Sequence, residues 1–155
     1  MKTLPIIKDI ETRLQQALPD FAVELFPEHP EKYRLNHANG AVLIAYHGSD
    51  YGEPKATDIA HQQRVIQWRL TVITRSQHND FGSLAALDAI RLSLLGYRPP
   101  HCDKLYLSKE QFDGEDAGLW QYGVSLYCHT QAVEQVTPKD LPTFKQGVYH
   151  NSTTQ

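Results

Sequence analysis

Two stretches of apolar–polar alternation constrain the fold of this chain most. In residues 65–74, apolar side chains alternate with Gln67, Arg69 and Thr71. Since neighbouring side chains of a strand point to opposite faces, each stretch predicts a strand with one buried and one polar face. The apolar set of the first stretch is Ile66, Trp68, Leu70 and Val72. In residues 119–130 the apolar set is Trp120, Tyr122, Val124, Leu126 and Cys128, and the opposite set is Gln121, Ser125, Tyr127 and His129.

Residues 5–18 predict a helix because apolar side chains recur at three- and four-residue steps from Ile7 to Leu18. Pro5 fits a first turn, and Pro19 stops the helix. A second helix is predicted from Phe81 to Leu94. Asn79 or Asp80 is its expected N-cap, and Gly96 fits a left-handed C-terminal cap.

Further strands are expected at residues 23–26, 41–46 and 105–108. Residues 41–46 are apolar without alternation, which indicates a strand covered on both faces. The strand at 105–108 is expected to pair with 119–130 as a hairpin around residues 112–118. Residues 48–60 are rich in Gly, Asp, Pro and Lys and predict a long exposed loop.

The order of these elements is helix, strands, helix, strands, and the strand connections are hairpin-like. This order favours an α+β fold in which two helices pack on one face of a mostly antiparallel sheet. The apolar density falls after about residue 132. We therefore expect one domain over residues 1–132 and an extended or disordered C-terminal arm over residues 133–155.

Composition excludes several classes of function but assigns none. The 155 residues carry 15 Lys and Arg against 18 Asp and Glu, a net charge of −3. That balance provides no basic field for nucleic acid. No apolar run is long enough for a secretory leader or a membrane span, so we expect no membrane association and a cytoplasmic chain with reduced cysteines.

One pattern resembles a metal-dependent nuclease. Asp20 follows a proline, and Glu53-Pro54-Lys55 lies far downstream. Such chemistry needs the Glu and the Lys on one rigid strand that faces a Mg²⁺ held by the Asp. Pro54 lies between them in the stretch richest in strand breakers, so a solvated loop is the better explanation.

The two cysteines, Cys102 and Cys128, each lie beside a histidine, which are residue types that zinc prefers. A hairpin centred near Glu115 would place the two cysteines across from each other. Adjacent strand residues point to opposite faces, so the four side chains would not converge on one ion. Two buried reduced thiols are the favoured explanation, ahead of a disulfide or a metal site.

Several short sequences, taken in order, resemble a known family. They are Gly40-Ala-Val-Leu-Ile-x-Tyr, Trp68-x-Leu-x-Val-x-x-x-Arg75, Ala86-Leu-Asp-Ala-Ile-Arg91, Leu95-Gly-Tyr-Arg-Pro-Pro-x-Cys-x-Lys-Leu-Tyr106 and Gly118-x-Trp-x-Tyr122. This series resembles Mu-like bacteriophage and prophage tail proteins and, through them, the tail terminators of long-tailed phages such as lambda. The likeness covers roughly residues 1–132.

The resemblance implies a structural protein and not an enzyme. Such a protein forms a homo-oligomeric ring, typically a hexamer, that caps the tail tube and contacts head–neck proteins. It implies no cofactor, no sequence-specific nucleic acid, assembly in the bacterial host cytoplasm and a final place in the virion tail. A head–tail connector or neck protein is the alternative, followed by the metal-dependent nuclease or hydrolase.

Strand alternation gives the candidate contact residues. The polar strand faces are expected to line a ring lumen or to meet the next subunit, and the 48–60 loop and the 133–155 arm are expected to contact neighbours. The candidates are Gln67, Arg69, Thr71, Gln121, Ser125 and Tyr127 on the strands, with Tyr51 and Glu53 in the loop.

Overall fold

The computed structural model describes residues 2–55 and 58–135, which form two α-helices, one short 3-10 helix and five strands. The elements are α1 (Thr3–Ala17), β1 (Ala22–Leu25), η1 (Pro30–Lys32), β2 (Gly40–Tyr51), β3 (His61–Thr74), α2 (Ser83–Leu94), β4 (Tyr106–Asp116) and β5 (Leu119–Val133). The expected arm over residues 133–155 lies outside the described residues from 136 onward, and Val133 itself belongs to β5.

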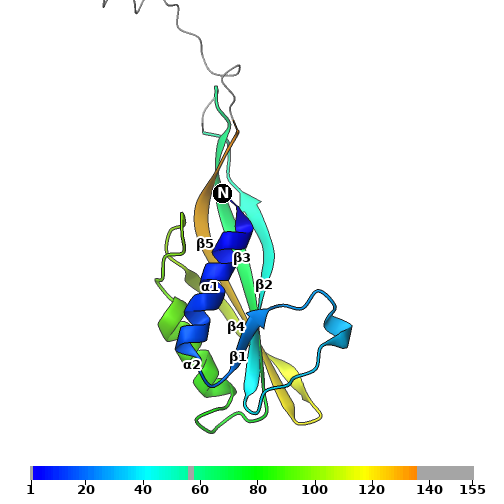
Figure 1. Ribbon diagram of the computed structural model, residues 1–155. Helices are drawn as coiled ribbons and strands as arrows, with labels where there is room; N and C mark the ends of the chain where they lie inside the picture. Colours follow the sequence, from blue (N-terminus) through cyan, green and yellow to red (C-terminus); the bar gives the residue numbers. More distant parts are fainter. Residues whose placement is uncertain (1, 56–57, 136–155) are drawn as a thin grey trace, which may run out of the picture.

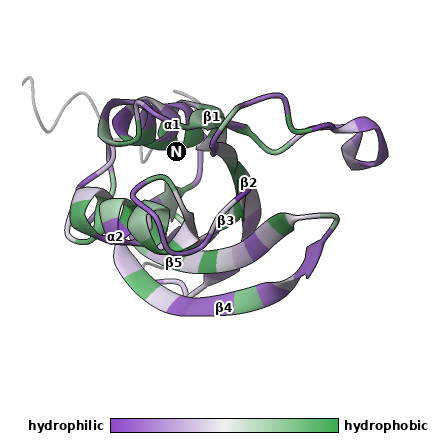
Figure 2. Cartoon of the chain, turned by 90° about the horizontal axis from the view of Figure 1, so that it is seen from below, coloured by the Kyte–Doolittle hydropathy of each residue, from purple (hydrophilic) through white to green (hydrophobic). Residues whose placement is uncertain are grey.

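The strands form one five-stranded sheet in the order β1-β2-β3-β5-β4. The short edge strand β1 runs parallel to β2, and the other neighbours pair antiparallel. Both helices lie on the same face of the sheet, and the view along the strands shows the sheet curving past them toward β4 (Figures 1 and 2). The predicted α+β class is therefore confirmed.

The core lies between the helices and the apolar face of the three central strands. Trp68 is 1% exposed, and its ring nitrogen donates to the Cys128 sulfur at 3.4 Å. The alternation therefore predicted the buried face of β3 and β5 correctly. The helices contribute Ile6, Ile7, Ile10 and Leu14 from α1 and Ala86, Leu87, Ile90 and Leu94 from α2.

The expected loop at residues 48–60 begins too early, although its end agrees with the structure. Strand β2 continues to Tyr51 and β3 begins at His61, with a bulge between Tyr46 and Gly48. Arg64 holds this end in place, since its guanidinium donates to the hydroxyls of Ser49 at 3.0 Å and Thr3 at 2.7 Å. Backbone pairing and this buried arginine, not apolar side chains, extend the strand through polar residues.

Because Thr3 opens α1, the strand residues beyond Arg64 extend past the end of the helix layer. Figure 1 shows β3 and β5 continuing beyond the N-terminus of α1. The residues after β2 follow beside them, since Gly52 donates to the Gln63 carbonyl and Lys55 to the His61 carbonyl. We call this part, residues 50–55, 61–63 and 131–133, the projecting end.

The β4–β5 hairpin is longer and more tightly closed than expected. Strand β4 runs from Tyr106 to Asp116, and Asp116 pairs with Leu119 across a two-residue turn. Ala117 and Gly118 have φ values of 51° and 81°, the left-handed geometry that closes such turns. The hairpin is therefore centred between residues 117 and 118 instead of near Glu115.

Helix α2 begins two residues later than the sequence predicted. Gly82, not Asn79 or Asp80, occupies the N-cap position, and no side chain caps the helix. The Asn79 carboxamide oxygen instead accepts from the Phe81 N–H at 2.9 Å, in a turn ahead of the helix. Gly96 has the expected left-handed φ of 80°. Neither described helix has the length and apolar character needed to cross a bilayer.

Candidate interaction surface

The six strand candidates lie together on the face of the sheet that the helices leave uncovered, here called the outer face. Gln67 pairs with Tyr127, and Arg69 pairs with Ser125 in the β3–β5 ladder. Thr71 stands opposite Gly123 on the same face, and Gln121 stands opposite Ile73. The alternation thus located one continuous surface. Its role as an interface remains a prediction.

A groove crosses the middle of the outer face, and its shape follows from side-chain size. Its floor is Gly123 and Ser125 of β5, which carry no side chain or a short one. Longer side chains flank the floor on both sides: Arg69 from β3, and Lys109 and Gln111 from β4. Two adjoining cavities of about 220 and 80 Å³ form the groove.

The groove is flanked by two cations. Lys109 and Arg69 both pair with Ser125 from opposite sides, so the three residues form a row across three strands. Adjacent strands are about 4.8 Å apart, which places the Cα atoms of Lys109 and Arg69 about 10 Å apart, with Ser125 between them. Within the described residues, neither cation forms an ion pair. The nearby Asp113 carboxylate accepts from the Gln111 amide at 2.9 Å.

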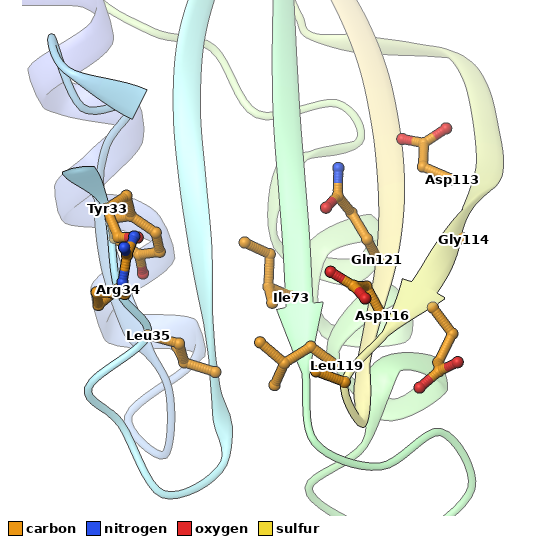
Figure 3. Close-up of a pocket in the computed structure, with 11 residues that line it drawn as sticks. Tyr33, Arg34, Leu35, Ile73, Asp113, Gly114, Asp116, Leu119 and Gln121 are labelled. Carbon is orange, nitrogen blue, oxygen red and sulfur yellow. The ribbon is translucent and has the colours of Figure 1, made fainter. Parts of the chain in front are cut away.

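A larger hollow of about 570 Å³ lies on the same face, between the β1–β2 connection and the β4–β5 hairpin. Figure 3 shows Tyr33, Arg34 and Leu35 on one side, and Leu119, Gln121 and the hairpin carboxylates on the other. Burial, followed by the nearby Glu24 carboxylate, raises the pKa of Tyr33. Ala41 and Leu43 of β2 are also buried, although they alternate with the core residues Val42 and Ile44.

The two loop candidates are not part of this surface. Tyr51 is the last residue of β2, stands opposite Arg64 and is 55% exposed on the projecting end. Glu53 follows in the exposed connection. Nearby, hydrogen bonds with Ser49 and Arg64 lower the pKa of Tyr46. The sequence predicted that Tyr51 lies in a loop, but Tyr51 is the last residue of β2. Its partner in β3 is Arg64, three residues before Gln67.

The nuclease alternative fails on geometry. The backbone carbonyl of Asp20 accepts from Asn39, directly before the first residue of β2. Glu53 lies beyond the last residue of the same strand. At about 3.3 Å per residue, a strand of 12 residues separates the two carboxylates by more than 30 Å. Among the described residues, no three His, Cys, Asp or Glu side chains cluster as metal ligands.

Cys102 and Cys128 are both buried and both free thiols. Cys102 precedes β4, where the Asp103 N–H donates to the His129 carbonyl and the Thr130 hydroxyl donates to the His101 carbonyl. The cysteines therefore lie side by side, although the hairpin register that led to this expectation is wrong. A hydrogen bond with Cys128, followed by burial, raises the pKa of the Cys102 thiol.

Sequence reasoning missed the groove because it treated β5 alone. Gly123 interrupts the polar set of β5, and a Cβ at this position would lie 2.8 Å from a carboxylate oxygen of Asp113. Lys109 was missed because β4 was expected to end at Ser108. A glycine within an alternating strand was the available signal of a close approach.

Fold and surface together define a class: a small α+β domain with one helix-packed sheet face and one exposed, grooved and charged face. A sequence model of the Gp37 protein family matches residues 10–151, so the chain belongs to that family.

The fold is also similar to a chain in the virion of a native gene transfer agent particle. The TM-score is 0.59 at 13% identity, covering 83% of this chain and 96% of that chain. No sequence among curated proteins matches this chain significantly.

Proposed function

We propose that this protein is a structural component of a phage-type virion, and that it acts as a ring-forming tail terminator. The observation that carries the proposal is the fold likeness, which includes nearly the whole of a chain from a virion particle, 96% of its length. Membership of the Gp37 protein family supports it. The ordered sequence likeness to Mu-like tail proteins supplies the more specific role.

The geometry agrees with a role in assembly. The helix-packed face holds the buried core, and every buried polar side-chain atom in the described residues has a hydrogen-bond partner. The outer face instead exposes charged side chains, a groove and the projecting end. When one surface of a protein binds a different surface on the next copy, the copies form a ring if the repeated rotation between them returns to the first copy.

In this role the protein works by shape and number. A ring at the end of the tail tube prevents further tube subunits from adding and presents its opposite side to the head–neck proteins. Neither step requires a cofactor or bond chemistry. The net charge of −3 fits a ring that surrounds nucleic acid without holding its backbone.

Electron microscopy of particles produced without this protein tests the role. A tail terminator predicts tails of uncontrolled length, because nothing stops tube growth. Tails of normal length that lack heads would contradict the terminator role and identify the protein as a connector or neck protein. Supplying the unchanged chain in trans should restore uniform tails and serves as the control.

A further inference from the structure

We infer that the acidic tip of the β4–β5 hairpin of one copy docks into the cationic groove on the outer face of the next copy. The tip consists of Glu115, Asp116, Ala117 and Gly118, and the groove is flanked by Arg69 and Lys109. This inference rests on the proposed ring and identifies the contact between its subunits.

The tip has the shape of an insert. It closes in a two-residue turn, so its end is only two strands wide, and residues 115–118 are all exposed. The Glu115 carboxylate accepts from the Gly118 N–H at 2.8 Å, which fixes the turn. Asp116 forms no ion pair within the described residues. The tip therefore presents negative charge on a rigid support.

The groove has the complementary shape and charge. Ser125 is the open part of its floor, since the Asp113 carboxylate lies over Gly123, and the two cations lie on opposite sides of Ser125. A carboxylate placed over Ser125 would lie between a guanidinium and an ammonium group, and Arg69 offers the paired donors that a carboxylate accepts. The Asp113 carboxylate, which accepts from Gln111, occupies the Gly123 end of the groove, nearer the tip of its own chain, so the place for an incoming carboxylate is the other end, over Ser125.

The tip cannot occupy the groove of its own chain. Asp116 pairs with Leu119, and Leu119 lies six residues before Ser125 along the same strand. At about 3.4 Å per residue, that separation is about 20 Å along a paired strand that does not fold back. The occupant must therefore come from another copy, and the tip and groove are two different surfaces, as a ring contact requires.

Two charge-reversal variants test the contact. The groove variant carries Arg69→Glu and Lys109→Glu, and the tip variant carries Glu115→Lys and Asp116→Lys. Each variant alone would oppose like charges and should weaken self-association in sedimentation-velocity experiments by on the order of tenfold or more. Thermal unfolding monitored by circular dichroism establishes that each variant folds.

An equimolar mixture of the two variants is the decisive measurement. In a mixture every contact can pair opposite charges, with the two variants alternating around an even-numbered ring. We expect the assembly and its size to return to within about threefold of the affinity of the unchanged chain. A matched control reverses two cations on the helix side, Lys8→Glu and Arg98→Glu, and should leave assembly unchanged in the presence or absence of either variant.

The outcomes separate the two proposals. If the unchanged chain forms a ring and the groove and tip variants form it equally well, this contact is wrong and the ring stands. If both variants lose assembly but their mixture does not regain it, the tip and the groove do not meet and the inference is wrong. If the unchanged chain stays monomeric at every concentration, the proposed ring fails and the inference with it.

Discussion

The two faces of strand β3 differ in how deeply their side chains are buried. On the helix side, Trp68, Leu70 and Val72 are at most 1% exposed. On the outer face, Gln67 and Arg69 are exposed although they alternate with these core residues. One face therefore supplies most of the free energy of folding, and the other is free to serve contacts with other molecules. Variants on the two faces, some at adjacent residues, should therefore differ in their effect on stability.

The largest difference is expected between Leu70 and Arg69. Leu70→Ala removes a fully buried side chain and leaves a cavity, so it should lower the free energy of unfolding by about 2–5 kcal/mol. Arg69→Ala, one residue away, should change it by less than about 0.5 kcal/mol. Urea unfolding of both variants measures the difference. Equal losses would show that the outer face also stabilises the monomer.

The thiols should be protected by the helix-side core. Burial shields both thiols from a reagent in solution, and the raised pKa also suppresses the thiolate of Cys102. A thiol-specific disulfide reagent should therefore react with both cysteines at least about a hundredfold more slowly in the folded protein than in denaturant. Two fast-reacting thiols in the native protein would contradict their burial. Fewer than two thiols in denaturant would indicate a disulfide.

Removing one threonine hydroxyl from each face of β3 compares what a single hydrogen-bonding group contributes to the free energy of unfolding. The Thr74 hydroxyl hydrogen-bonds with the Ser83 hydroxyl at 2.8 Å and lies 2.7 Å from the Ser76 carbonyl oxygen, where it positions the start of α2. Thr74→Val should cost about 1–2 kcal/mol because these buried partners lose their hydrogen bond. Thr71→Val, on the outer face of the same strand, should stay within about 0.5 kcal/mol. Thermal or urea unfolding of the two variants provides the test.

The smallest effect is expected at the exposed rim of the helix side. Arg91 of α2 pairs with Asp88 and, at 2.8 Å, with Glu110 of β4. The hydrogen bond with Glu110 raises the pKa of Arg91. Arg91→Ala should cost less than about 1 kcal/mol, and the loss should shrink at high salt because exposed ion pairs are screened. A larger loss that salt does not change would mean that the arginine stem, not its charge, holds the helix on β4.

The sequence was most informative where a buried face imposes a period. The alternation in β3 and β5 predicted which side chains are buried, and the helical spacing from Ile7 to Leu14 predicted the core face of α1. These patterns are reliable because the positions that face the core recur at the period of the helix or strand, and apolar residues must occupy them.

The sequence was least informative where pairing and tertiary contacts determine the structure. Residues 48–51 form a strand through backbone pairing with β3 and the buried Arg64, and neither leaves a local pattern. The extent of β4 was missed because its side chains are exposed over nearly its whole length. The groove was missed because it depends on the register of three strands, which no single strand encodes.

The projecting end has a mechanical consequence. Strands β3 and β5 stay paired without a register shift from the helix-packed core to the last pair of this end, whereas β2 has a bulge and ends at Tyr51. A force applied to it along the strands loads many ladder hydrogen bonds at once, in shear, instead of opening them one after another. Tension applied to the projecting end is therefore transmitted directly to the core, so this end should resist extension along the strands.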